Sequence, residues 1–236
     1  MAKKTSKRKT LNILDKNKKH SQFDYTEIFR HIRTNIEFST VDKDIKSICI
    51  TSSQAGEAKT TLSINLAYIF ATKYNRVLLI DCDLRKNTLH KYMGLSNKHG
   101  LTDALLEYRQ TKKLNVEYFQ SVNDPSFAGT MAVLTSGIHI PNPSELLGSH
   151  VFKDYINELK KSFDFIIIDC APVGMTSDAI PVGNAVDGTI FAISSQDTNK
   201  KDAANCVKLL QRNNVNVLGS VLTKAKSLSG SHYYYY

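Results

Sequence analysis

A lysine followed by a threonine, Lys59-Thr60, stands where a short apolar segment gives way to a small polar loop and then to a helical pattern. The apolar segment covers residues 47–51, and apolar residues return at helical spacing between Leu62 and Phe70. Backbone N–H groups at such a helix start are unpaired and bind phosphate oxygens together with the positive end of the helix dipole. A lysine can then reach the outer phosphates while a Ser/Thr hydroxyl holds Mg²⁺. The segment therefore predicts a nucleotide phosphate site.

The loop departs from the phosphate-loop pattern G-x-x-x-x-G-K-[ST], because Ser53 and Ala58 occupy the two glycine positions. Ala58 is the larger departure, since a positive φ costs a non-glycine residue about 1–2 kcal/mol. For this segment alone, an ordinary loop and an amphipathic helix with an exposed lysine is the alternative.

Carboxylates follow two further apolar segments. Residues 77–80 lead into Asp81 and Asp83, and residues 165–168 lead into Asp169. Such continuous apolar runs are typical of parallel strands covered on both faces. A single aspartate at a strand end is more often a turn or cap residue. Because ligands of open parallel sheets bind beyond the carboxyl ends of the strands, the three strand ends together predict a Mg-nucleotide site.

Strand and helix patterns alternate along the rest of the chain. The expected elements are a helix at 101–108, a strand at 131–134, a helix at 144–161 capped by Ser144, strands at 188–193 and 217–222, and a helix at 199–211 between them. The alternation predicts an α/β fold with a doubly wound, mostly parallel sheet flanked by helices.

Composition predicts one domain. A chain of 236 residues, of which 42% are hydrophobic, suffices for one well-buried core. The four cysteines are widely spaced and lie in or beside apolar segments, which indicates reduced core residues of a cytosolic protein. We see neither a signal-peptide pattern nor an apolar window long enough to span a membrane.

The net charge of +9 is concentrated at the N-terminus. Residues 1–20 contain eight Lys/Arg and one Asp, so +7 lies there and +2 in the other 216 residues. We expect a basic disordered leader at 1–20 and a folded domain at 21–226. The alternative is a basic arm that touches nucleic acid or the anionic surface of a membrane.

Four consecutive tyrosines, Tyr233, Tyr234, Tyr235 and Tyr236, follow a polar segment that contains a glycine. We expect residues 227–236 to form a flexible tail with accessible phenol hydroxyls. Phosphorylation would add up to about −2 charge to each ring and so repel the tail from an acidic site. A sticky terminus without function is the alternative.

Glu27, Arg30 and Arg33 lie three residues apart along one side of a predicted helix, while isoleucines occupy another side. Arginine forks suit carboxylate contacts across a subunit boundary. A solvated helix face with a local Glu–Arg pair accounts for the spacing equally well.

Taken together, these segments resemble the bacterial tyrosine kinase family (BY-kinases), and more narrowly the Gram-positive cytoplasmic kinases of capsule and exopolysaccharide synthesis. The resemblance runs from about residue 25 to residue 236. It rests on the Glu27/Arg30/Arg33 set, the loop at 51–61, the segments at 81–86, 143–147 and 169–173, and the terminal tyrosines.

The resemblance implies an ATP:protein-tyrosine phosphotransferase on a P-loop NTPase fold of the deviant Walker A, MinD-like group. It implies ATP or ADP with Mg²⁺ as cofactors. Lys59 would contact the phosphates, Thr60, Asp83 and Asp169 would hold the metal, and Asp81 would be the base for the tyrosine hydroxyl. The roles of Asp81 and Asp83 could be exchanged. The residues expected to bind the nucleotide are Gln54, Ala55, Gly56, Glu57, Ala58, Lys59, Thr60 and Thr61.

The resemblance also implies assembly into a ring, in which Glu27, Arg30 and Arg33 join neighbouring subunits and each tyrosine tail enters the next subunit's site. The expected partners are further copies of the chain, a membrane adaptor that activates through its cytoplasmic end, protein tyrosine substrates and a cognate tyrosine phosphatase, with no nucleic acid. The kinase would be cytoplasmic and recruited to the inner face of the membrane.

Three departures from the family pattern keep other hypotheses open. Ala58 replaces a glycine, Asn87 stands where a proline is common, and Cys170-Ala171 replaces Thr-Pro. A catalytically weakened scaffold of the same complex is one alternative. A ParA/MinD-type ATPase is another, but the second lysine of that group, five positions before Lys59, is Gln54 here.

Overall fold

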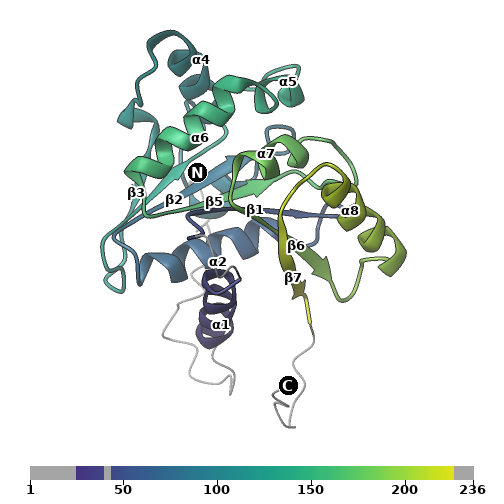
Figure 1. Ribbon diagram of the computed structural model, residues 1–236. Coiled ribbons are helices and arrows are strands. Elements are labelled where there is room, and N and C mark those ends of the chain that lie inside the picture. The colour runs from purple at the N-terminus through teal and green to yellow at the C-terminus, as the bar shows by residue number, and fades with distance from the viewer. Residues whose placement is uncertain (1–24, 40–43, 226–236) are drawn as a thin grey trace, which may run out of the picture.

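The chain forms a single seven-stranded sheet with helices on both faces (Figure 1), in a computed structural model that describes residues 25–39 and 44–225. The strand order is β3-β4-β2-β5-β1-β6-β7. In chain order the strands are β1 (Ser47–Ser52), β2 (Arg76–Cys82), β3 (Gln120–Val122), β4 (Thr130–Leu134), β5 (Phe165–Cys170), β6 (Gly188–Ser194) and β7 (Val217–Thr223).

Every strand pair is parallel except β3 with β4, so the predicted doubly wound, mostly parallel sheet is confirmed. The register places Asp81 of β2 beside Asp169 of β5, and Asp169 beside Ile50 of β1. The carboxyl ends of three central strands therefore meet at one edge of the sheet, which we call the carboxyl edge.

Two helical layers cover the sheet. The helices are α1 (Tyr25–Glu37), α2 (Lys59–Ala71), α3 (Leu89–Met93), α4 (Leu101–Thr111), the 3-10 turn η1 (Val116–Tyr118), α5 (Pro143–Leu147), α6 (His150–Ser162), α7 (Ala179–Ala185) and α8 (Lys200–Arg212). In Figure 1, α1 and α2 lie below the sheet and α6 and α7 lie above it.

The two faces of the sheet carry separate hydrophobic cores. Alternate residues of the central strands point into each core, which explains why β1 and β5 are buried along their whole length. Below the sheet, Phe70 of α2 stacks on Phe165 of β5 with ring centroids 3.8 Å apart. The four cysteines are buried and free, as the sequence predicts.

The predicted helix at 144–161 is wrong, because the chain forms two helices there. It breaks at Gly148, and Ser149 caps the second helix by accepting a hydrogen bond from the N–H of Phe152 at 3.2 Å. Ser144 is not a cap either, since Pro143 begins α5 and the Ser144 hydroxyl donates to Asp178. The short elements α3, η1, β3 and α7 have no counterpart in the sequence prediction.

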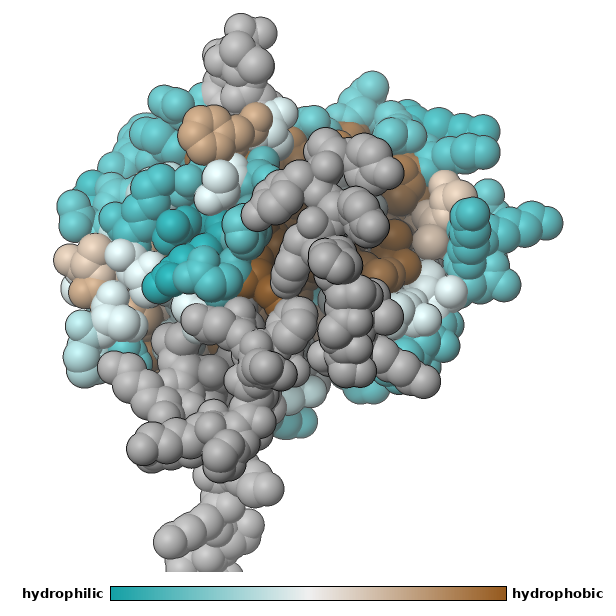
Figure 2. Space-filling view, turned by 90° about the horizontal axis from the view of Figure 1, so that it is seen from below, coloured by the Kyte–Doolittle hydropathy of each residue, from teal (hydrophilic) through white to brown (hydrophobic). Residues whose placement is uncertain are grey.

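Several predictions lie outside the described residues: the basic leader at 1–20, the tail at 227–236 and the tyrosines at 233–236. Within the two described ranges, every helix is too short or too polar to cross a membrane. Seen from below the sheet, the molecule is mostly hydrophilic, with a hydrophobic area near the centre of that side (Figure 2).

Candidate active site

The phosphate loop lies between β1 and α2 at the carboxyl edge. Its backbone takes a positive φ at Gly56 (85°) and at Ala58 (62°), so Ala58 is left-handed, as the glycine pattern predicts. α2 begins immediately afterwards with no side-chain cap and no acidic residue in its first turn. The helix start therefore presents uncapped N–H groups, which favours an anion there.

Asp169 binds the first turn of α2 through both of its oxygens. The hydroxyl of Thr60 donates to Oδ2 at 2.6 Å, and the hydroxyl of Ser63 donates to Oδ1 at 3.0 Å. Lys59 is buried in the same turn. The structure thus brings Lys59, Thr60 and Asp169 together as the sequence predicts, and adds Ser63.

Asp81 and Asp83 occupy the end of β2 beside Asp169. The N–H of Asp83 donates to Oδ1 of Asp81 at 3.1 Å, whereas Oδ2 of Asp81 is buried without a hydrogen-bond partner in the described part of the chain. Oδ1 of Asp83 accepts from the N–H of Lys86 at 2.9 Å. The less buried Asp83 is therefore tied to its own turn, and Asp81 carries the free oxygen.

Burial raises the pKa of both inner carboxyls, and nearby negative charges add to the effect. Burial raises the pKa of Asp169 to about 6, although the Thr60 and Ser63 hydroxyls and the Lys59 ammonium oppose the change. Burial, with the negative charges of Asp169 and Asp83, holds the pKa of Asp81 well above its usual range. Such a group accepts a proton readily, and a cation placed between the two carboxyls would relieve their repulsion.

The oxygen donors present fit a magnesium ion. Carboxylate and hydroxyl oxygens are the ligands that Mg²⁺ takes, and it normally keeps several waters and binds substrate phosphates as well. Within the described residues, no group of three or more His, Cys, Asp or Glu side chains is arranged to hold a metal ion by itself.

A second cluster, which the sequence did not reveal, joins β2 to the helices above the sheet. Nε of Arg85 donates to Asp178 at 2.6 Å, and Nη2 of Arg85 donates to Ser144 at 2.9 Å. Burial alone would raise the pKa of Asp178, but the hydrogen bonds from Arg85 and Ser144 lower it. Arg85 follows Asp83 by two residues, so this cluster fixes the chain directly after the two carboxylates.

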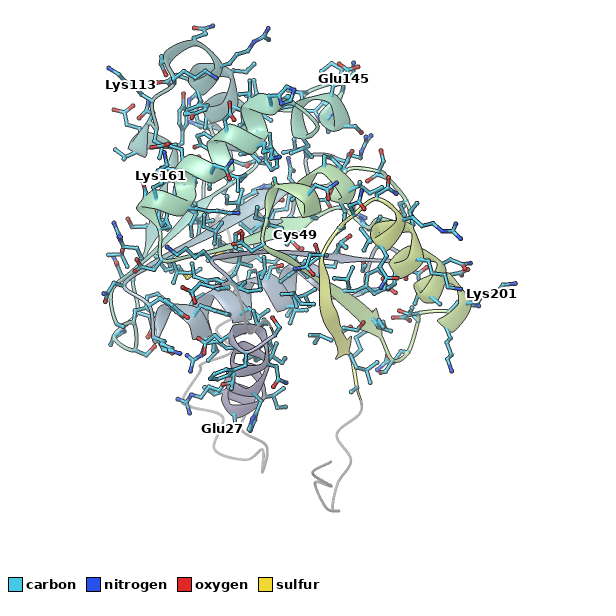
Figure 3. All side chains as sticks on the ribbon, viewed as in Figure 1. Glu27, Cys49, Lys113, Glu145, Lys161 and Lys201 are labelled. Atoms are coloured by element: carbon cyan, nitrogen blue, oxygen red, sulfur yellow. The ribbon has the colours of Figure 1, made fainter. Side chains whose placement is uncertain are left out.

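The predicted oligomerisation residues on α1 have unequal surroundings. Glu27 and Arg30 are exposed and form a pair within the helix, and Glu27 lies at the lower end of α1 (Figure 3). Arg33 instead donates to the carbonyl of Ile69 at 2.9 Å, near the end of α2. In the isolated subunit Arg33 therefore holds α1 against α2.

Two surface cavities in the described part of the chain have no lining residue in the phosphate loop, although Thr198, which lines the first of them, donates to Glu57 of that loop. One, of about 580 Å³, is lined by α8 and the ends of β6 and β7. The other, of about 560 Å³, lies among α4, α5 and α6.

Comparison with known proteins agrees with this geometry. The family model described as AAA domain matches residues 45–218. The chain is 40% identical to the tyrosine-protein kinase YwqD of Bacillus subtilis over 89% of its own length and 86% of the relative's. It is 36% identical to the putative tyrosine-protein kinase CapB of Staphylococcus aureus over 100% and 98% of the two chains. Its fold matches the kinase domain of the Escherichia coli tyrosine kinase ETK with a TM-score of 0.76, at 28% identity, over 89% and 79% of the two chains.

Fold and site together define a P-loop NTPase-type domain. The chain belongs to the bacterial tyrosine kinase family, and its enzyme class is protein-tyrosine kinase.

Proposed function

We propose that this chain transfers the γ-phosphoryl group of Mg-ATP to tyrosine hydroxyls, and that its own Tyr233, Tyr234, Tyr235 and Tyr236 are acceptors. The observation that carries the proposal is the meeting of Lys59, Thr60, Asp81 and Asp169 at one edge of the sheet. The process would regulate the synthesis and export of a capsular or extracellular polysaccharide, as the resemblance to the Gram-positive kinases of capsule and exopolysaccharide synthesis implies.

Each residue has a role that its surroundings support. The loop N–H groups from Ala55 to Thr61 and the Lys59 ammonium would bind the phosphates, since the Gln54 N–H already donates to Glu57, and Thr60, Asp83 and Asp169 would hold Mg²⁺. The bound ion supplies charge neutralisation at the phosphates. Asp81 accepts the tyrosine proton on its free Oδ2, while the tyrosine oxygen takes the phosphoryl group and ADP leaves. In a loose transition state, positioning and charge stabilisation contribute most of the catalysis.

The assembly is also part of the proposal. Glu27 and Arg30 are exposed on α1 and free to reach a neighbouring subunit if their internal pair opens. Arg33 would contact the neighbouring subunit through the guanidinium N–H groups that do not bind α2. Alternatively, it would support Glu27 and Arg30 by holding α1 in place. The tail of one subunit would enter the site of the next, and a membrane adaptor would recruit the kinase to the inner face of the cell membrane.

The test is mass spectrometry of the C-terminal peptide after the full chain is incubated with Mg-ATP and the cytoplasmic end of the adaptor. We expect phosphotyrosine within 233–236 in the wild type and none in Lys59→Met. Unmodified tyrosines in the wild type under these conditions, with ATP intact, would contradict the proposal.

The left-handed Ala58 favours a second candidate, a scaffold that has kept the fold but binds nucleotide poorly. Calorimetry with Mg-ADP separates the two. No measurable heat of binding, even with the adaptor fragment present, would support the scaffold, whereas saturable binding that Lys59→Met abolishes would support the kinase.

A further inference from the structure

Glu57 lies in the middle of the phosphate loop, yet its side chain is completely buried. A glutamate without access to solvent is unusual and requires compensating hydrogen bonds. The proposed catalytic steps do not use this carboxylate. Its burial therefore calls for another role.

The Glu57 carboxylate accepts three hydrogen bonds. Oε2 accepts from the N–H of Gln54 at 2.9 Å, and Oε1 accepts from the hydroxyls of Ser53, at 2.8 Å, and Thr198. Burial alone would raise the pKa of Glu57, but these bonds lower it. The group is thus an ionised acceptor that closes the loop on itself between residues 53 and 57.

The same residue attaches the loop to the neighbouring strands. Thr198 belongs to the connection between β6 and α8, and Thr223 at the end of β7 donates its hydroxyl to the Glu57 carbonyl at 2.9 Å. Gln54 adds a bond from its side chain to the Asp197 carbonyl at 2.9 Å. Residues outside the phosphate loop therefore bind both the side-chain carboxylate and the backbone carbonyl of Glu57.

Ala58, the next residue, has the conformation that these bonds would enforce. Its φ of 62° is left-handed, and an alanine pays for that conformation where a glycine does not. A strained backbone persists only where its surroundings over-determine it. At Ala58 this constraint comes from the preceding residue, because both the carboxylate and the carbonyl of Glu57 are held by hydrogen bonds.

We propose that Glu57 is a positioning residue that holds Ala58 in the left-handed conformation and so keeps the loop in its nucleotide-binding shape. The chain thereby retains a binding loop although it lacks the glycine at position 58. This inference rests on the proposed function only in so far as that shape serves nucleotide binding.

The test is a double-mutant cycle of Glu57→Gln and Ala58→Gly, with thermal unfolding measured without nucleotide. Glutamine replaces one of the two carboxylate oxygens with an NH₂ group, which cannot accept a hydrogen bond. At least one of the hydrogen bonds to residue 57 is therefore lost. With Glu57 present, Ala58→Gly relieves the strain and we expect Tm to rise by about 2–4 °C. In Glu57→Gln the loop has already relaxed, so the same glycine should raise Tm by less than about 1 °C.

Affinity for Mg-ADP gives the second readout. A relaxed loop binds only through the fraction that keeps the competent shape. We expect Glu57→Gln to raise Kd about tenfold when position 58 holds alanine and about twofold when it holds glycine, since glycine takes the left-handed conformation freely. If the wild type bound no Mg-ADP, the proposed function would fail while the Tm cycle still decided this inference.

Asp187→Asn is the matched control, because Asp187 also accepts several hydrogen bonds, from Lys46, Ser47 and Lys160, but at the start of β6. In the Asp187→Asn background, Ala58→Gly should raise Tm by as much as it does in the wild type. If Glu57→Gln fails to fold, Thr198→Val removes one of the bonds and should show the same pattern at smaller size. Equal Tm gains in all backgrounds, or equal affinity losses whether alanine or glycine occupies position 58, would overturn the proposal.

Discussion

The aspartates at the two ends of the parallel strands differ in their hydrogen-bond partners and in the direction of their pKa shifts. At the carboxyl edge, Asp81 and Asp169 lie side by side with raised pKa values, and one oxygen of Asp81 has no partner among the described residues. At the amino edge, Asp187 accepts from Lys160 at 2.9 Å and from the Ser47 hydroxyl at 2.8 Å, and Asp164 accepts from Arg76 at 3.2 Å.

The pKa values follow the pairing. Burial alone would raise the pKa of Asp187, but the hydrogen bonds from Lys160 and Ser47 lower it. The same residue type therefore stabilises the fold at one edge, whereas at the other edge burial and nearby negative charges disfavour its ionised form. Such a contrast is expected where a site is built to receive positive charge and not to stabilise the empty protein.

The largest expected effect tests whether only the carboxyl edge carries the chemistry. Asp81→Asn removes the proton acceptor, and we expect the rate of tyrosine phosphorylation to fall by about 10²–10⁴-fold. The matched change at the other edge, Asp164→Asn, should leave the rate within about twofold. Phosphotyrosine formation with time is measured for both, and comparable losses in the two variants would break the comparison.

Stability should respond in opposite directions at the two edges. Because burial moves the pKa of Asp169 from 3.8 to about 6, its charged form costs the nucleotide-free protein about 3 kcal/mol at neutral pH. We expect Asp169→Asn to raise the free energy of unfolding by up to about that amount. Asp187→Asn should lower it by about 1–2 kcal/mol, because paired donors lose their acceptor.

Urea unfolding without nucleotide measures both variants. If Asp169→Asn were as destabilising as Asp187→Asn, the free-energy cost assigned to the buried charge of Asp169 would be absent.

The pH dependence sharpens the same point. A carboxyl whose pKa is raised on folding binds more protons in the folded state, so its contribution to stability is present below about pH 4 and is lost as pH rises through about 6. The difference in unfolding free energy between wild type and Asp169→Asn should therefore grow between pH 4 and pH 6. A difference that stayed constant over this range would show that Asp169 titrates normally.

The smallest expected effect concerns α2, which begins at Lys59 on the carboxyl edge and ends beside Arg33 of α1. Arg33→Ala should cost about 1–2 kcal/mol of stability, because the hydrogen bond from Arg33 to the Ile69 carbonyl and its packing between α1 and α2 are lost. Glu27→Ala with Arg30→Ala should change stability by less than about 0.5 kcal/mol, since that pair is exposed.

Light scattering gives the second half of this test. Any ring should dissociate in the Glu27/Arg30 double variant although the subunit stays as stable as the wild type. An unchanged mass would reject the interface proposed for these two residues.

The sequence predicted the parts of the site that follow from local pattern. Apolar runs ending in Asp81 and Asp169 identify buried strands and the edge where they end, and Lys59-Thr60 identifies the loop. Parallel pairing then brings these groups together without further information. The left-handed Ala58 was also predictable, because the loop pattern places a glycine there.

What could not be predicted depends on contacts between distant segments. Asp178 meets Arg85 across 93 positions, and Glu57 meets Thr198 across 141. Neither pair leaves a local signal, since each residue alone is an ordinary polar side chain. The break at Gly148 was missed for a different reason: the apolar pattern continues through it, and only the cap at Ser149 separates α5 from α6.

The most direct test of the account is the number of protons released when Mg-ADP binds at pH 6, measured by calorimetry in buffers of different ionisation enthalpy. If the ion and phosphates enter between Lys59, Asp81 and Asp169, the raised carboxyl pKa values must fall, and the wild type should release about half a proton or more. Asp169→Asn should release fewer. Binding with no proton release in the wild type would contradict the placement of the nucleotide at these strand ends.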